Sequence, residues 1–325
     1  MTLTRGARLT GAALCAALAA LAAAWIVRDF RAVDDPLALR WSWAGGGPPP
    51  GRQVTTTLHD PVLLIGYVVA GIAALRASVA PSVLLTASVV TFAVRLPALW
   101  MVAATWMDLR ATDELRSRAL LCTFAVLGMA AALLITAVAG RRPAHRTDLP
   151  ARPSRRAAAT AFLLLASAAA VRAAWEVYWT TEIPARAYLD RFSGSASLPM
   201  PLLGTPPGWL SAVLVLIALA AAAGALFRGV HSRPLGLAAA GLLTASGAAG
   251  LSLMIRADLP SRLGELAVPE QLAVASLLFE CAAGAVTLLV LARRGAGDGS
   301  GGALPQVQRP AVHGPPPPSS LPPGW

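Results

Sequence analysis

Long apolar runs separated by short polar segments dominate the pattern of this chain. A helix that spans a bilayer needs about 17–25 mostly apolar residues. Eight runs meet this requirement, and the predicted spans lie at approximately 9–27, 58–76, 81–103, 119–140, 157–179, 209–227, 235–255 and 271–292. The second run is the shortest, because its continuous apolar stretch covers only 61–75. The pattern predicts an all-α fold, a polytopic transmembrane bundle of about eight spans.

Composition and charge favour a bacterial plasma membrane. Hydrophobic residues make up 56% of the 325 residues and charged residues 13%, which is about half the charged share of a soluble domain. All 27 basic residues are arginine, a bias typical of GC-rich bacterial genomes. With the N-terminus inside, the inner segments are rich in arginine and their only acidic residues are Asp148 and Asp298. This positive-inside distribution puts both termini in the cytoplasm.

The aromatic residues and the net charge fit the same topology. Six tryptophans fall at predicted outer helix ends, where amphipathic rings prefer the membrane interface: Trp25, Trp100, Trp106, Trp175, Trp179 and Trp209. The arginines flank helices without interleaved aromatic residues, so the net charge of +11 reflects topology and no nucleic-acid partner is expected. The expected partner is the lipid bilayer.

Short motifs recur in the same order in the two halves of the chain. Ala23-Ala24-Trp25 recurs as Ala173-Ala174-Trp175, the sequence LLTAS occurs at 84–88 and at 242–246, and both halves end on paired arginines. One pentamer match is expected by chance in so biased a composition, so the collinear order carries the argument. We interpret residues 1–140 and 157–294 as two parallel four-helix repeats. Convergence of apolar helices on similar patterns is the alternative.

Two further segments complete the predicted organisation. Residues 141–156 form a basic cytoplasmic linker between the repeats, and 295–325 form a disordered, Gly- and Pro-rich cytoplasmic tail. The first apolar run also resembles a secretory signal, because Arg5 and Arg8 precede it and small alanines follow. We expect this helix to be retained, since the repeat pairs it with the internal run at 157–179.

Four ionisable residues fall inside predicted spans: Arg95, Arg172, Glu176 and Glu280. A charge at the centre of a spanning helix costs about 2.5–3.5 kcal/mol on insertion scales, so such residues usually face a bundle interior and are paired. We interpret them as an outward-facing polar cavity that binds an anionic ligand. Two simpler alternatives are an intrahelical Arg172–Glu176 pair and an Arg95 that is solvated because Pro97 ends its helix.

The loops and cysteines offer few candidates for chemistry. Asp34 and Asp35 in the first outer loop are the candidates for a catalytic base. The four histidines, His59, His145, His231 and His313, all lie in predicted loops or the tail, so no haem or metal and no other cofactor is expected. Cys15, Cys122 and Cys281 lie inside predicted helices as unpaired thiols.

Three functional hypotheses follow from these features. The first is a non-enzymatic, transporter-like bundle whose halves enclose the polar cavity. The second is an accessory or assembly protein whose intramembrane charges bind a partner membrane protein. The third is a membrane enzyme that acts on a lipid-linked substrate at the outer face, with Asp34 or Asp35 as base.

Overall fold

The computed structural model describes residues 2–33, 35–47, 49, 51–143, 154–198, 200–227, 229 and 231–293. Within these residues the protein is an all-α helix bundle with eight helices long and apolar enough to cross a membrane, which confirms the predicted fold class. The spanning helices are α1 (Arg5–Ala32), α3 (His59–Arg76), α4 (Ala80–Arg95) continued by α5 (Ala98–Ala103), α6 (Asp113–Ala139), α7 (Arg155–Glu182), α9 (Pro207–Leu226), α10 (Ser232–Arg256) and α11 (Val268–Ala292). Asp34, most of the predicted linker and the whole predicted tail lie outside the described residues.

The first helix is an integral part of the bundle. It begins after Thr4, whose hydroxyl accepts a hydrogen bond from the Ala7 amide, and its residues Cys15 and Leu18 are fully buried. It ends at Ala32, well beyond the predicted boundary at 27. Asp29, which the sequence pattern puts just after the helix, therefore lies in the last turns of α1.

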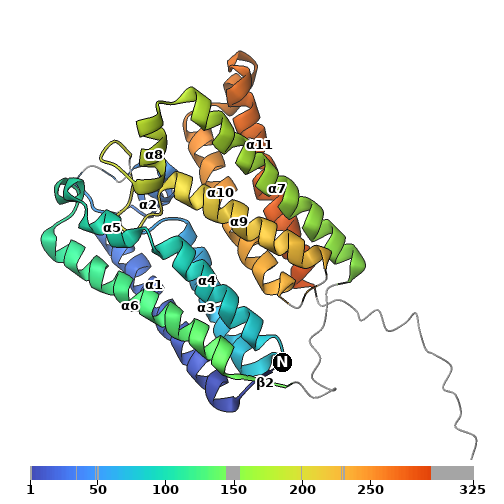
Figure 1. The fold of residues 1–325 in the computed structure, drawn as a ribbon. Helices are drawn as coiled ribbons and strands as arrows, with labels where there is room; N and C mark the ends of the chain where they lie inside the picture. Colours follow the sequence, from blue (N-terminus) through green and yellow to red (C-terminus); the bar gives the residue numbers. More distant parts are fainter. Residues whose placement is uncertain are drawn as a thin grey trace, which may run out of the picture.

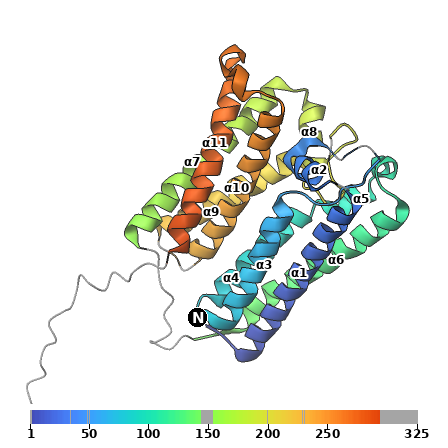
Figure 2. The same ribbon diagram turned by 180° about the vertical axis from the view of Figure 1, so that it is seen from behind.

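The spanning helices form two four-helix groups (Figures 1 and 2). In the first group α1 and α4 each pack against α3 and α6, and in the second α7 and α10 each pack against α9 and α11. The groups meet where α10 contacts α3 and α4 and where α9 contacts α4. One continuous apolar core crosses this seam, because Leu18 and Leu84 of the first group share it with Leu165, Leu214 and Leu242 of the second.

A proline creates part of this seam. The third predicted span is continuous in sequence but breaks between α4 and α5, because Pro97 has no amide hydrogen to donate to the Ala93 carbonyl one turn earlier. The indole of Trp209 on α9 donates to that carbonyl over 2.7 Å. The Thr205 hydroxyl donates to the neighbouring Val94 carbonyl over 2.9 Å. Backbone acceptors near the break in one group are thus satisfied by side chains of the other.

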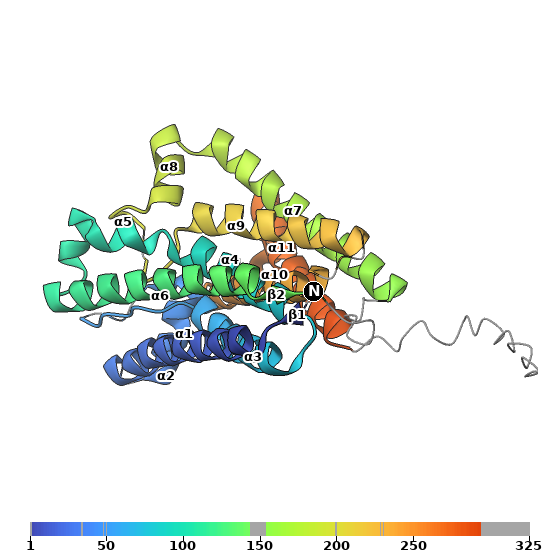
Figure 3. The same cartoon turned by 60° about the horizontal axis from the view of Figure 1, so that its bottom comes forward.

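The two ends of the bundle differ (Figure 3). One end, here called the short-helix end, carries short elements: α2 (Pro36–Trp41), η1 (Ser42–Gly46), α5, η2 (Thr105–Leu109), α8 (Ala185–Ser193) and η4 (Pro260–Glu265). The opposite end, here called the arginine end, holds a two-residue antiparallel ladder between β1 (Thr2–Leu3) and β2 (Arg141–Arg142). There Arg8, Arg141 and Arg233 donate to the Leu75, Ala137 and Leu291 carbonyls at helix C-termini, where the helix dipole favours cations.

Candidate functional site

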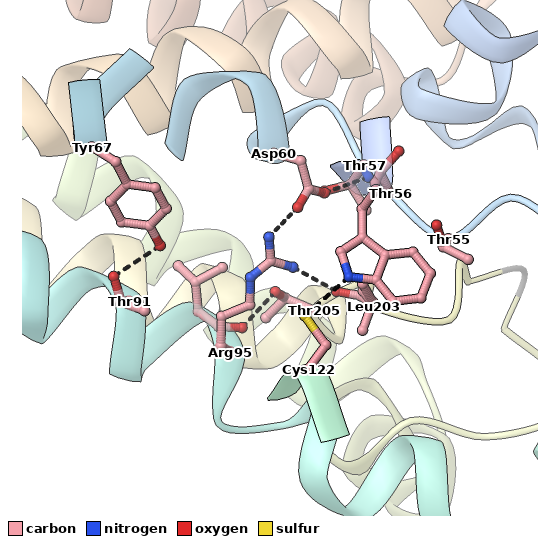
Figure 4. A network of polar contacts seen from close by, with 12 residues as sticks. Thr55, Thr56, Thr57, Asp60, Tyr67, Thr91, Arg95, Cys122, Leu203 and Thr205 are labelled. Carbon is pink, nitrogen blue, oxygen red and sulfur yellow. Dashed lines mark hydrogen bonds and ion pairs between the residues drawn. The ribbon is translucent and has the colours of Figure 1, made fainter. Parts of the chain in front are cut away.

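Arg95 and Asp60 form a buried ion pair near the short-helix end of the first group (Figure 4). Arg95 is the last residue of α4 and Asp60 the second residue of α3, and their side chains are 11% and 2% exposed. The guanidinium also donates to the Leu203 carbonyl over 3.3 Å. The second carboxylate oxygen of Asp60 accepts from the amide and the hydroxyl of Thr57, over 2.6 and 3.1 Å. Arg95 is therefore paired and buried, so the alternative of a solvated Arg95 is wrong.

A second buried carboxylate, Asp29, holds the segment that leads into α3. Its two oxygens accept four hydrogen bonds, from the amides and hydroxyls of Thr55 and Thr56, at 2.6–2.9 Å. Arg28 also contacts it over 2.9 Å. Together, Asp29 and Asp60 fix three consecutive threonines to the ends of α1 and α3. Sequence reasoning missed this arrangement, although the Thr-Thr-Thr-Leu-His-Asp stretch just before a span was its visible signal.

A small cavity lies beside Arg95 within the first group. The cavity has a volume of about 20 Å³. Its polar lining comes from Arg95, Tyr67, Thr123, Trp25 and Cys122. That volume suits a single water. The Tyr67 hydroxyl lies 2.9 Å from the Thr91 hydroxyl on α4, and the Trp25 indole donates to the Cys122 sulfur over 3.0 Å. Of the four charged residues predicted to share a cavity, only Arg95 lines this one.

Arg172 and Glu280 form a second ion pair, in the interior of the second group. The guanidinium Nη2 of Arg172 on α7 lies 2.6 Å from Oε2 of Glu280 on α11, and the side chains are 14% and 5% exposed. Both residues sit in mid-helix. Counting about 1.5 Å per residue, Arg172 lies about 15 Å and Glu280 about 18 Å from the short-helix end of its helix. The Arg172 Nε atom is buried and has no hydrogen-bond partner among the described residues.

Glu176 does not pair with Arg172, so the predicted intrahelical pair is wrong. Its Oε1 atom instead lies 2.9 Å from Arg191 on α8, whose guanidinium also covers the ring of Trp179 at 5.2 Å. Glu176 Oε2 and Arg191 Nε are buried without a partner in the described part of the chain. Burial and the neighbouring Glu176 carboxylate raise the pKa of Tyr188 on α8.

His59 connects the two groups. α3 begins at His59, in agreement with the predicted span 58–76, so the interpretation of this histidine as a loop residue is wrong. Its Nε2 atom lies 2.9 Å from the Ser246 hydroxyl on α10, and its ring lies within electrostatic range of both Arg95 and Arg172. His59 thus links α3 of the first group to α10 of the second, and the charges of Arg95 and Arg172 both act on its ring.

The remaining candidates lie apart from this region. Asp35 is exposed, and its Oδ1 atom accepts the Leu37 amide at the start of α2 over 2.9 Å, so it caps a short helix. Asp34 lies outside the described residues. Cys15, Cys122 and Cys281 are free thiols. Across the described ranges, no three His, Cys, Asp or Glu side chains gather as a metal site.

The four predicted charges thus take part in three separate ion pairs and do not share one cavity. Arg95 pairs with Asp60, Arg172 with Glu280, and Glu176 with Arg191. Comparison with protein-family models, with characterised proteins and with solved structures found no match for this chain.

Proposed function

We propose that this multi-pass membrane protein is a small transporter-like bundle that binds an anionic solute at its buried arginines, in the interior of its two four-helix groups. The observation that carries the proposal is the placement of two arginines, Arg95 and Arg172, inside spanning helices. Each is held by a carboxylate from a different helix, and both lie within electrostatic range of His59 at the seam.

Physical cost supports a functional role for these charges. The desolvation cost of burying an ion pair can exceed the Coulombic gain, and apolar replacements are often neutral or stabilising. Intramembrane charges are for this reason a functional hypothesis by default. The same pairs weaken the hypothesis of an assembly protein. A guanidinium that is already paired with a carboxylate of its own chain has fewer free donors for the helix of a partner protein. The enzyme hypothesis loses support as well, since Asp35 caps α2.

Thermal stability of the purified protein in detergent tests the proposal. A ligand that binds the folded state raises the unfolding temperature by mass action, so at least one member of a panel of small carboxylates, phosphate, sulfate and nitrate should do so. Arg172→Ala should remove the shift. Arg118→Ala is the matched control, because Arg118 forms an exposed surface pair with Glu114. An equal shift in wild type and Arg172→Ala, or no shift with any anion, would contradict anion binding at this region.

We further propose a bacterial plasma membrane, with the arginine end in the cytoplasm. Arg5, Arg76 and Arg142 are exposed at that end, whereas several arginines of the short-helix end are paired with acidic residues. In a background with the three native cysteines replaced, Pro143→Cys should resist an impermeant thiol reagent applied to intact cells. Ser197→Cys, at the short-helix end, should react. The reverse result would invert the orientation.

We also propose that the two groups descend from a duplicated four-helix unit. The order of helix packing is the same in both, with α1, α3, α4 and α6 corresponding to α7, α9, α10 and α11. An up-and-down bundle gives this order without ancestry, so a side-chain contact is the stronger support. Trp25 and Trp175, the tryptophans of the repeated Ala-Ala-Trp motif, each donate the indole N–H to the last helix of their own group, to Cys122 and Ser276.

A further inference from the structure

We propose that Arg172 and Glu280 form an exchange site at which a solute carboxylate replaces Glu280 on the guanidinium while Glu280 takes up one proton. The inference rests on the proposed function and deepens it, since it names the class of solute, a carboxylate, and the coupling ion, a proton. It also assigns these roles to one of the two ion pairs and leaves the other as a fixed support.

The number of other contacts separates the two pairs. Asp60 accepts two hydrogen bonds from Thr57 in addition to its contact with Arg95, and Arg95 also donates to the Leu203 carbonyl. For Glu280, the hydrogen bond from Arg172 is the one found among the described residues. A carboxylate fixed by several donors is costly to displace, whereas one held by a single guanidinium is replaced when another carboxylate supplies the same bond.

Arg172 also has unused binding capacity. A guanidinium carries five N–H donors arranged as a fork that fits a carboxylate through two parallel bonds. In Arg172, Nη2 contacts Glu280 and the buried Nε has no partner. A solute carboxylate that bridged Nε and an Nη atom would satisfy the orphan donor that Glu280 leaves unused.

A route to the site follows α7 from the short-helix end. Glu176 lies one turn from Arg172 toward that end, and Arg191 on α8 pairs with Glu176. Glu176 Oε2 and Arg191 Nε, like Arg172 Nε, are buried and unpartnered within the described residues. Buried polar groups in proteins are normally satisfied, often by water. These atoms form a polar series from α8 along α7 to the ion pair, and the solute carboxylate would enter along it.

Charge balance requires that Glu280 take up a proton during the exchange. Before exchange the positive guanidinium faces one negative carboxylate. Afterwards it faces the solute carboxylate, and Glu280 has lost its counter-charge in the interior of the bundle. Among the described residues, the two helices packed on α11 offer no replacement at this depth. On α7 the other arginines, Arg155 and Arg156, lie in the first turn, and the arginines of α10, Arg233 and Arg256, lie at its ends. An ionised carboxylate without a partner there is strongly disfavoured, so Glu280 takes a proton from water and the net charge of the site is unchanged.

Calorimetry of the full-length protein in detergent tests this exchange, with sodium acetate as the probe. Titrations in two buffers of different ionisation enthalpy give the number of protons taken up per acetate bound. Wild type should take up about one proton per acetate, as charge balance requires. Glu280→Gln, which carries a permanently neutral side chain, should bind acetate without proton uptake. Arg172→Ala should bind acetate at least about tenfold more weakly, the loss expected for a charge-assisted hydrogen bond.

The outcomes separate this inference from the proposed function. Acetate binding by wild type without proton uptake, or equal uptake by Glu280→Gln, would overturn the exchange while leaving anion binding in place. A wild type that bound phosphate or sulfate but no acetate would overturn the carboxylate class. Failure to bind any anion would overturn both proposals. The number of protons taken up per acetate is measured on wild type alone. The test therefore stays decisive even if the Glu280→Gln protein fails to fold.

Discussion

The two buried ion pairs are built from the same chemical groups and differ in how they are held. Arg95–Asp60 lies at helix ends, where a loop threonine and a loop carbonyl complete its hydrogen bonds. Arg172–Glu280 lies in mid-helix on both sides, where neighbouring backbone groups are already engaged within their helices. A pair at helix ends becomes part of the backbone framework, whereas a mid-helix pair depends on its two side chains alone. This difference is why we assign a structural role to the first and exchange to the second.

Exchanging the positive and negative residues within each ion pair should give the largest difference between the two pairs in the recovery of folded protein. Arg172→Glu with Glu280→Arg keeps one positive and one negative side chain at the same depth, so most folded protein should be recovered relative to either single reversal. Arg95→Asp with Asp60→Arg should not be recovered, because an arginine at 60 cannot accept the hydrogen bonds of Thr57. Monodisperse yield on size exclusion measures the outcome. Equal recovery of both exchanges would show that the two pairs are held alike.

Removal of a single partner should be the next largest effect. Asp60→Ala leaves Arg95 buried without its carboxylate and the Thr57 amide without its acceptor, so we expect a loss of about 3–5 kcal/mol in the free energy of unfolding. Denaturant or thermal unfolding in detergent measures it. Asp190→Ala on α8, a residue without an ion pair among those found in the described chain, is the control and should change stability little. A small effect of Asp60→Ala would show that this carboxylate does not hold the first pair in place.

An added carboxylate should rescue one truncation and fail to rescue the other. Glu280→Ala vacates the Arg172 guanidinium, so acetate should bind there and raise the unfolding temperature of the variant more than that of wild type. Asp60→Ala should gain little, because acetate must also satisfy Thr57 inside a tightly packed loop. The measurement is the acetate-dependent shift in the unfolding temperature of each variant and of wild type. Rescue of Asp60→Ala alone would reverse the roles assigned to the two pairs.

The sequence predicted the scaffold far better than the contacts. Spanning helices depend on the length of apolar runs, which is a local property, and all eight were found, with bounds within about six residues of the predicted ones. The break at Pro97 was visible as well, because proline acts on its own helix. The longer α1 was missed, since polar residues such as Arg28 and Asp29 extend the helix only when partners in the 51–58 segment satisfy them.

Pairing of charges was beyond the sequence pattern because it depends on which helix faces which. Arg172 and Glu280 were both identified as intramembrane charges, but the i,i+4 spacing pointed to a pair of Arg172 with Glu176, which pairs with Arg191 instead. Asp60 was hidden by its place at the edge of a predicted span, where an acidic residue needs no explanation. His59 was assigned to a loop for the same reason.

The smallest expected effect tests whether the two groups share an origin. Trp25 and Trp175 occupy the same place in a repeated motif and donate to Cys122 and Ser276, each over 3.0 Å. Trp→Phe at each position should lower the free energy of unfolding by about 0.5–1.5 kcal/mol, the range of a single hydrogen bond, with the smaller loss at Trp25 because sulfur is the weaker acceptor.

Double-mutant cycles make this comparison specific to the two bonds. Combining Trp25→Phe with Cys122→Ala, and Trp175→Phe with Ser276→Ala, should give coupling energies of the same sign, measured by unfolding in detergent. The loss of indole area is common to both backgrounds of each cycle and therefore cancels. Coupling in the second group without coupling in the first would make the matched bonds a coincidence. The duplication would then depend on the motif order alone, since packing order is common to up-and-down bundles.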